Sequence, residues 1–291
     1  VCGTICPCCV HKPHHSSRRS RTCALFLIPV AKIAVACAAH NGLRAFQLQL
    51  RVIALTKRPI AIAGQDRAKL RQPHSAIHLR IAAARHVLAG DTSVRGSYGG
   101  WRPQLYGTGL HGSVVSIVGL GAVGRAIVDR LSGFGCAQLL GVDPHGDDER
   151  LTMVSLGEAL SQSDYVILAV PLLDVTRHLV NDTMLEGVRR GQILVNIGRG
   201  SVVDEAAVAR ALKDERLGAY AADVYEMEDW LLADRPRQIH PELLQHPSTV
   251  FTPHIGSAVK KVRRAIELQA AENLLVALNG NEPLAHYEAS H

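Results

Sequence analysis

Three side chains that could take part in catalysis each follow a short apolar run of the sequence. His254 lies in the stretch FTPHIGS, where a proline and a glycine mark a turn after the apolar run TVF. Arg199 lies in the glycine-flanked turn of NIGRGSVVDE, and Glu228 lies in YAADVYEMEDW, five residues after the aspartate that ends an apolar run. If these runs are parallel strands, their ends meet at one edge of a sheet, which is where ligands bind in such folds.

The chemistry of these side chains is complementary. A carboxylate beside an imidazole favours the protonated ring and fixes its tautomer, which makes a histidine a usable acid or base near neutral pH. A guanidinium binds carboxylate or phosphorus oxyanions through two parallel hydrogen bonds. The three residues therefore predict a site in which His254 is the acid or base, Glu228 orients it and Arg199 binds an anionic substrate.

Each residue also has a plainer interpretation. A single histidine after a strand is most often a loop residue that faces water, and the acids between Asp223 and Asp229 could form a solvated loop. Arg199 could be a surface arginine paired with Asp204 or Glu205. The positions of these side chains in the folded chain decide between the two interpretations.

A glycine-rich motif predicts a cofactor for such a site. The motif GLGAVG begins at Gly119, directly after an apolar run and at the start of a helical pattern, which is the context of a dinucleotide-binding turn. Free N–H groups at a helix N-terminus bind pyrophosphate there. Asp143 ends the next apolar run, 24 residues after Gly119, and an acid at this position accepts hydrogen bonds from ribose hydroxyls and repels a 2′-phosphate. The motif therefore predicts NAD, although His145 and Arg150 nearby would suit NADP.

The elements that must position these residues alternate regularly between strand and helix. The apolar runs predict strands at residues 113–119, 137–143, 165–171 and 192–198. The helical patterns lie at residues 76–91, 122–135, 176–188, 204–215 and 257–280, and a glycine-rich link occupies residues 93–110. This alternation predicts an α/β fold with a Rossmann-type doubly wound parallel sheet, together with a second, smaller and here atypical substrate domain.

Composition separates the first part of the chain from the rest. No Asp or Glu precedes Asp66, and that stretch carries nine Lys and Arg, whereas the remaining 226 residues carry 23 basic and 26 acidic side chains. The net charge of +6 therefore belongs to the N-terminal part, and a nucleic-acid-binding face is not expected on the body. Residues 17–40 resemble a secretory signal, but Pro29 and Lys32 interrupt the apolar run, which is too short to span a membrane. A wrong start site or a reading-frame slip would give a stretch of the same kind.

Cysteine usage is similarly uneven. Five of the seven cysteines fall within the first 23 residues: Cys2, Cys6, Cys8, Cys9 and Cys23. Their spacing fits no two-pair zinc pattern, so we expect no metal site. The body has few cysteines, which favours a cytoplasmic protein.

Taken in order, GLGAVG, Asp143, NIGRG, DVYEMED and TPHIGS resemble the D-isomer-specific 2-hydroxyacid dehydrogenases. In that family an arginine at the strand edge, a glutamate five residues after the DV aspartate and the histidine of the PHxG turn form the catalytic trio. The resemblance places these roles on Arg199, Glu228 and His254. It implies an NAD site formed by Gly119, Gly121, Ala122, Val123, Gly124, Asp143, Pro144, Val170, Pro171, Asn196, Gly198, Asp223 and Gly256.

Longer segments indicate which group within this family the sequence resembles. WRPQLYGTGL, RGSVVDEAAV, YAADVYEMEDW and the stretch from DRPRQIHPELL to TPHIGSAV look like phosphite (phosphonate) dehydrogenases, which oxidise phosphite to phosphate with reduction of NAD. Phosphite oxidation is therefore the first expectation. The alternatives are a D-2-hydroxyacid dehydrogenase or 2-ketoacid reductase, a non-catalytic NAD-binding protein of the corepressor type, and an inactive truncated homologue.

The resemblance also implies a domain plan. Residues 1–75 would be an atypical N-terminal part of the substrate domain, 76–256 the NAD-binding domain with the first hinge helix, and 257–291 a C-terminal hinge helix that returns to the substrate domain. Relatives have a substrate-binding lysine that falls on Lys57 in LRVIALTKRP, although the glycine and aspartate that follow it in the family are missing. Relatives are dimers, so we expect a homodimer that acts on a small anion, with no nucleic acid or membrane as partner.

Overall fold

The computed structural model describes residues 74–281. Lys57, the N-terminal cysteines and the segment at residues 17–40 that resembles a secretory signal lie outside the described residues. Within them, no helix is both long enough and apolar enough to cross a membrane.

The centre of the fold is a seven-stranded sheet in the order β3-β2-β1-β4-β5-β6-β7, and every neighbouring pair is parallel. The strands are β1 (Val114–Val118), β2 (Gln138–Val142), β3 (Thr152–Met153), β4 (Tyr165–Leu168), β5 (Gln192–Asn196), β6 (Leu217–Ala222) and β7 (Thr249–Phe251). Every residue of β4 and β5 is buried, as expected of parallel strands that are covered on both faces. The strand order reverses between β1 and β4, and such a reversal is the usual place for a ligand in an open parallel sheet.

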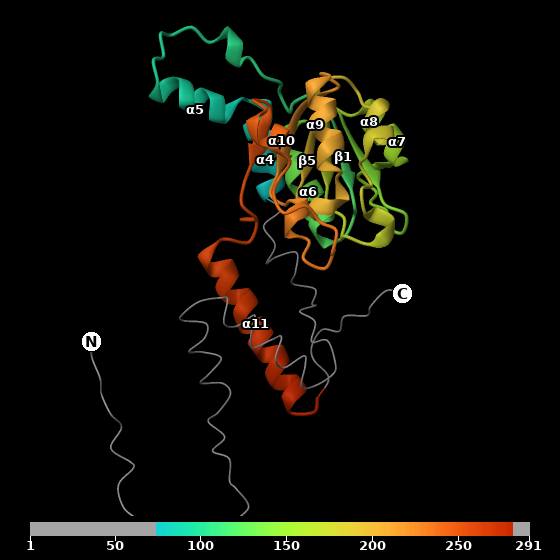
Figure 1. Ribbon diagram of the computed structural model, residues 1–291. Helices are drawn as coiled ribbons and strands as arrows, with labels where there is room; N and C mark the ends of the chain where they lie inside the picture. Colours follow the sequence, from blue (N-terminus) through green and yellow to red (C-terminus); the bar gives the residue numbers. More distant parts are fainter. Residues whose placement is uncertain (1–73, 282–291) are drawn as a thin grey trace, which may run out of the picture.

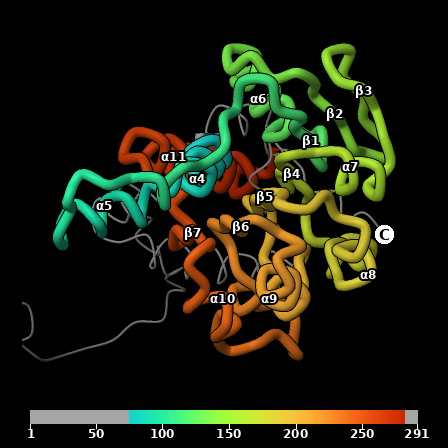
Figure 2. Tube along the Cα trace, turned by 90° about the horizontal axis from the view of Figure 1, so that it is seen from above, coloured from blue at the N-terminus to red at the C-terminus, as the bar shows by residue number. Residues whose placement is uncertain are grey.

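Two apolar cores lie on opposite faces of this sheet, and Figure 2 shows helices on both of these faces. One contains side chains of α4 (His74–Ala84) and α6 (Ala122–Leu131). The other is formed by α7 (Leu156–Gln162), α8 (Asp182–Glu186), α9 (Glu205–Lys213) and α10 (Pro241–Gln245). These layers confirm the prediction of a doubly wound α/β fold.

The helices outside the two layers extend away from the body in Figure 1. They are α5 (Val87–Arg95), which is followed by the glycine-rich link, and the long helix α11 (Lys260–Leu278). The single helix predicted at residues 76–91 is therefore wrong, because the chain turns at His86, whose φ is +49°, and continues as α5. The Ala84 carbonyl at the end of α4 instead accepts a hydrogen bond of 2.9 Å from Thr108 N.

The helix predicted at residues 176–188 is much shorter in the structure. A 3-10 turn from Asp174 to Thr176 ends where the predicted helix begins, residues 177–181 are not helical, and α8 begins only after Asn181. The Asn181 side chain accepts a hydrogen bond of 3.1 Å from Met184 N and caps this helix. Asparagine at this position therefore sets the start of α8.

Candidate active site

The glycine motif forms a narrow turn between β1 and α6. Gly119 has a φ of +95°, and a Cβ at this position would lie 2.9 Å from the Ala169 carbonyl oxygen. A Cβ on Gly124 would lie 1.9 Å from the Gly119 oxygen, so only glycine lets α6 approach the strand end this closely. Gly121 is the N-cap of α6, and a Cβ there would have no atom within 4 Å. The turn thus presents the N-terminus of a ten-residue helix to open space, which suits a pyrophosphate.

Asp143 follows β2 and lies beside this turn. Its carboxylate accepts hydrogen bonds from Leu120 N at 2.7 Å, His145 N at 2.9 Å and Gly146 N at 2.8 Å. Although partial burial raises it, these hydrogen bonds lower the pKa of Asp143 below its usual value. An ionised carboxylate held in this loop is suited to accept hydrogen bonds from ribose hydroxyls, and the exposed Pro144 follows it directly.

The turns after β4 and β5 lie against one another. The buried Asn196 donates from Nδ2 to Arg199 O at 2.9 Å and accepts from Gly198 N at 3.1 Å. A Cβ on Gly198 would lie 2.6 Å from the Val170 carbonyl oxygen, which precedes Pro171. The residues expected at the cofactor site, namely Val170, Pro171, Asn196 and Gly198, thus lie at the carboxyl edge of neighbouring strands.

His254 and Glu228 come together as the sequence predicts. His254 Nδ1 lies 2.8 Å from Glu228 Oε2, and the two side chains are 52% and 25% exposed. Since a carboxylate only accepts hydrogen bonds, Nδ1 is the donor and Nε2 is left for another partner. His254 therefore has an exposed position in its loop, as the plainer interpretation expects, and its Nδ1 is engaged by Glu228.

Asp223 holds the backbone of the turn that carries His254. Its buried carboxylate accepts from Thr252 Oγ1 at 2.5 Å, Ile255 N at 2.9 Å and Gly256 N at 2.8 Å. The turn needs this support because His254 has a φ of +53°, in the left-handed region that costs energy for any residue except glycine. Sequence reasoning assigned Asp223 and Gly256 to the cofactor and missed their hydrogen bond to each other.

Arg199 is exposed at the end of β5, and its Nη1 donates to the Gly198 carbonyl at 2.9 Å. Asp204 caps α9 by accepting from the backbone of residues 206 and 207, and Glu205 accepts from Glu226 N and His240 N. Neither acid pairs with Arg199, so the plainer interpretation of this arginine is wrong. Its guanidinium is suited to bind an anion at the same sheet edge.

The acids between Asp223 and Asp229 do not form a solvated loop. Asp223 and Glu226 are 3% and 8% exposed, and both accept backbone hydrogen bonds from other loops. Their burial could not be predicted from the run of charges in the sequence.

Comparison with known proteins gives consistent results. The family model described as "D-isomer specific 2-hydroxyacid dehydrogenase, NAD binding domain" matches residues 77–256. A glyoxylate/hydroxypyruvate reductase B of Erwinia tasmaniensis is 35% identical over 211 residues, which are 69% of this chain and 63% of that protein. A glyoxylate reductase of Pyrococcus horikoshii is 34% identical over 218 residues, 72% of this chain and 63% of that protein. The chain thus spans less than two thirds of the length of these relatives.

Solved structures show the same fold. The TT0316 protein of Thermus thermophilus has a TM-score of 0.67 at 33% identity, with 74% of this chain and 68% of that chain covered. A glyoxylate reductase from Paecilomyes thermophila has a TM-score of 0.67 at 29% identity, with 75% and 65% covered. The three reductases among these relatives are named for reduction of keto acids and not for oxidation of phosphite.

Proposed function

The chain belongs to the D-isomer-specific 2-hydroxyacid dehydrogenase family and contains its NAD-binding domain, and we propose that it reduces a small 2-keto acid to the 2-hydroxy acid with NADH. The observation that carries the proposal is the pair His254–Glu228 at 2.8 Å, at the same sheet edge as the exposed Arg199. These residues follow β7, β6 and β5, which are consecutive strands of the sheet.

Each residue has a role in this reaction. Arg199 binds the substrate carboxylate through its guanidinium. NADH held at the glycine turn before α6 would supply a hydride for the carbonyl carbon. His254 delivers a proton from Nε2 to the carbonyl oxygen, while Glu228 accepts from Nδ1 and orients the ring. Gly119, Gly121 and Gly124 would hold the pyrophosphate at the N-terminus of α6.

Further residues complete the proposed NAD site. Asp143 would accept hydrogen bonds from the adenosine ribose, as its position after β2 and its ionised carboxylate allow. The other residues that we assign to the cofactor are Ala122, Val123, Pro144, Val170, Pro171, Asn196, Gly198, Asp223 and Gly256. Titration of the purified chain with NADH and NADPH tests this set, with tighter binding of NADH expected because Asp143 repels a 2′-phosphate.

The substrate is the finer part of the proposal. Sequence segments favoured phosphite, whereas glyoxylate and hydroxypyruvate are the substrates in the names of the relatives, and they support the keto-acid alternative better. Phosphite oxidation would use the same residues, with Arg199 on the phosphorus oxyanion and His254 as the base for the attacking water. A non-catalytic NAD-binding protein of the corepressor type would bind NADH without turnover.

The other half of the substrate cleft is proposed from the resemblance alone. We propose that residues 1–75 and the segment 257–291 form the substrate domain and that Lys57 contacts the substrate anion. The basis is the resemblance of LRVIALTKRP to the family and the position of α4 and α11 on either side of the NAD-binding domain in sequence.

We also propose a homodimer that forms through the extension between α4 and β1. This extension exposes the large apolar side chains of Val87, Leu88, Val94, Tyr98, Trp101 and Tyr106. Trp101 and Tyr106 are 74% and 72% exposed, and a concentration of apolar surface of this kind marks an interaction site. Light scattering should give twice the mass of one chain for the unmodified protein and a lower mass for Trp101→Glu.

A substrate panel tests the proposed reaction. Purified chain is mixed with NADH and glyoxylate, hydroxypyruvate or pyruvate, and in parallel with NAD and phosphite, D-lactate or D-glycerate. We expect NADH consumption with a keto acid, which Arg199→Gln lowers through a higher KM, while the exposed control Arg190→Gln leaves it unchanged. Phosphite-dependent NADH formation would show that phosphite, and not a keto acid, is the substrate class. Tight NADH binding without any turnover would favour the non-catalytic alternative.

A further inference from the structure

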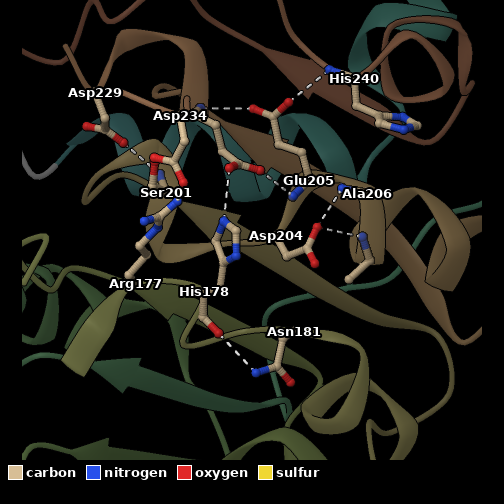
Figure 3. Close-up of polar contacts among 12 residues, drawn as sticks. Arg177, His178, Asn181, Ser201, Asp204, Glu205, Ala206, Asp229, Asp234 and His240 are labelled. Atoms are coloured by element: carbon tan, nitrogen blue, oxygen red, sulfur yellow. Dashed lines mark hydrogen bonds and ion pairs between the residues drawn. The ribbon is translucent and has the colours of Figure 1, made fainter. Parts of the chain in front are cut away.

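Two glutamates are buried between the turns that carry Arg199 and Glu228. Glu205 is the first residue of α9 and is 3% exposed, and Glu226 lies in the 3-10 helix η5 (Glu226–Glu228) and is 8% exposed. Figure 3 shows Glu205 with its carboxylate hydrogen-bonded to the backbone of His240. We refer to Glu205 and Glu226 as the glutamate pair.

The hydrogen bonds of the glutamate pair are reciprocal. Glu226 Oε1 accepts from Glu205 N at 2.9 Å, and Glu205 Oε1 accepts from Glu226 N at 3.1 Å. Glu205 Oε2 accepts from His240 N at 2.8 Å, and burial raises the pKa of Glu205. Each side chain therefore fixes the backbone of the segment from which the other comes.

The same two segments touch directly beside the glutamate pair. A Cβ on Gly200 would lie 1.8 Å from the backbone carbon of Tyr225, so the two backbones are in contact. Ser201 N donates to Asp229 Oδ2 at 2.7 Å. Gly200 follows Arg199 and Asp229 follows Glu228, so these contacts lie next to the proposed catalytic side chains.

A third segment adds a histidine to the glutamate pair. His178 Nε2 lies 2.9 Å from Glu226 Oε2, and His178 N donates to Ser201 O at 2.7 Å. The neighbouring Arg177 is engaged with Asp234 at 2.7 Å. His178 thus contacts both of the segments that the glutamate pair joins (Figure 3).

Two buried carboxylates at one place are costly unless each is hydrogen-bonded. Apolar side chains could fill the same space but could not bind the backbone N–H groups at the start of α9 and η5. Carboxylates bind these groups in one geometry, since each oxygen has a defined donor. Burying the two carboxylates costs free energy, but their hydrogen bonds fix the positions of two turns relative to each other. These turns follow different strands.

We propose that Glu226 and Glu205 are positioning residues, which hold the turn of Arg199 and the turn of Glu228 in register, and that His178 fixes Glu226. The proposal rests on the proposed function, because it concerns the alignment of the anion-binding residue with the acid–base pair. A displacement of about 1 Å between such groups can lower the rate roughly 100-fold. Neither glutamate contacts substrate or cofactor in this proposal.

The test compares Glu226→Ala with Glu226→Gln in the full chain. Gln keeps the shape and an acceptor for Glu205 N, so it should retain most of the function, whereas Ala leaves the backbone donor unpaired. Glu186→Ala, an exposed glutamate at the end of α8, is the control. Three quantities are measured: backbone hydrogen exchange, the Kd for NADH, and kcat and KM for glyoxylate.

We expect Glu226→Ala to speed hydrogen exchange in residues 198–206 and 224–230 together, with no change in the peptides of β1 and α6. The Kd for NADH should rise less than about tenfold, because the glycine turn and Asp143 lie on other strands and Gly198 is the one assigned cofactor residue in the loosened turn, while kcat/KM falls on the order of 100-fold. Glu226→Gln should lie within about tenfold of the unmodified chain, which corresponds to about one hydrogen bond. This rescue separates a positioning role from a general loss of stability.

Several results would overturn the proposal. One is faster exchange in residues 224–230 with unchanged exchange in the turn of Arg199, and another is a kcat/KM of Glu226→Ala equal to that of the unmodified chain. Failure of the unmodified chain to turn over any keto acid would refute the proposed function, but the exchange data would still decide whether the glutamate pair joins the two turns. If Glu226→Ala does not fold, His178→Gln is used, with the same pattern of exchange expected at a smaller amplitude.

Discussion

Replacement of Asp223 by asparagine tests whether this carboxylate holds the turn of His254 or serves the cofactor alone. The asparagine oxygen can still accept from Thr252 Oγ1 and Ile255 N, but the amide group would face the Gly256 N–H, which in the unmodified chain donates to the carboxylate at 2.8 Å. Loss of one charge-assisted hydrogen bond and the approach of two donors should lower the free energy of unfolding by about 2–3 kcal/mol. Thr252→Val removes only the hydroxyl and should cost about 1 kcal/mol.

The assay is urea unfolding without cofactor, followed by NADH titration and steady-state kinetics with glyoxylate. We expect Asp223→Asn to lose stability in the absence of NADH and to lower kcat, because His254 is no longer held in its strained conformation. An unchanged free energy of unfolding combined with weaker NADH binding would refute this reasoning. Asp223 would then act on the cofactor, as the sequence alone suggested.

Three further predictions concern single contacts. Glu228→Gln removes the carboxylate that accepts from His254 Nδ1 at 2.8 Å and should lower kcat/KM for keto-acid reduction roughly threefold, since a partly exposed ion pair contributes about 0.7 kcal/mol; an unchanged kcat/KM would contradict the pairing. The hydrogen bonds of Arg150 lower the pKa of Asp148 to about 2, so the stability from this carboxylate is present above its ordinary pKa and lost as the pH falls from about 4 to 2. Asp148→Asn should therefore flatten the pH dependence of the urea midpoint between about pH 4 and 2, and a profile with the original slope would be inconsistent with this. Gly124→Ala places a methyl group 1.9 Å from a backbone oxygen and should abolish NADH binding in a titration, whereas unaltered affinity would show that the turn can open.

Much of the fold follows from local signals in the sequence. The apolar runs that become β4 and β5 are buried along their whole length, and their composition alone indicates parallel strands covered on both faces. The GLGAVG motif could be interpreted because its spacing reflects a requirement for glycine. The structure leaves no room for a Cβ at Gly119 or Gly124. The pairing of His254 with Glu228 could be predicted because both follow strands, and neighbouring parallel strands bring their carboxyl ends together.

Other features depend on contacts between distant segments. The burial of Glu226 is not visible in the string DVYEMED, because it requires Gly200 to bring another turn into backbone contact. The support of the His254 turn by Asp223 depends on a residue 31 positions earlier in the chain. The substrate also could not be predicted from the motifs, because phosphite and keto-acid enzymes share the chemistry that these motifs describe.

The proposed reaction requires direct transfer of hydride from NADH to the keto acid and a proton from His254, and isotope labelling measures the hydride transfer. Purified chain is mixed with NADH that carries deuterium at nicotinamide C4, in the transferred position, and glyoxylate, and the glycolate formed is examined by mass spectrometry. The account predicts one deuterium on the product carbon with the unmodified chain and, for His254→Gln, retained NADH binding with product formation slowed on the order of 100-fold or more. Labelled glycolate formed at equal rates by both proteins, or no glycolate from the unmodified chain, would contradict it.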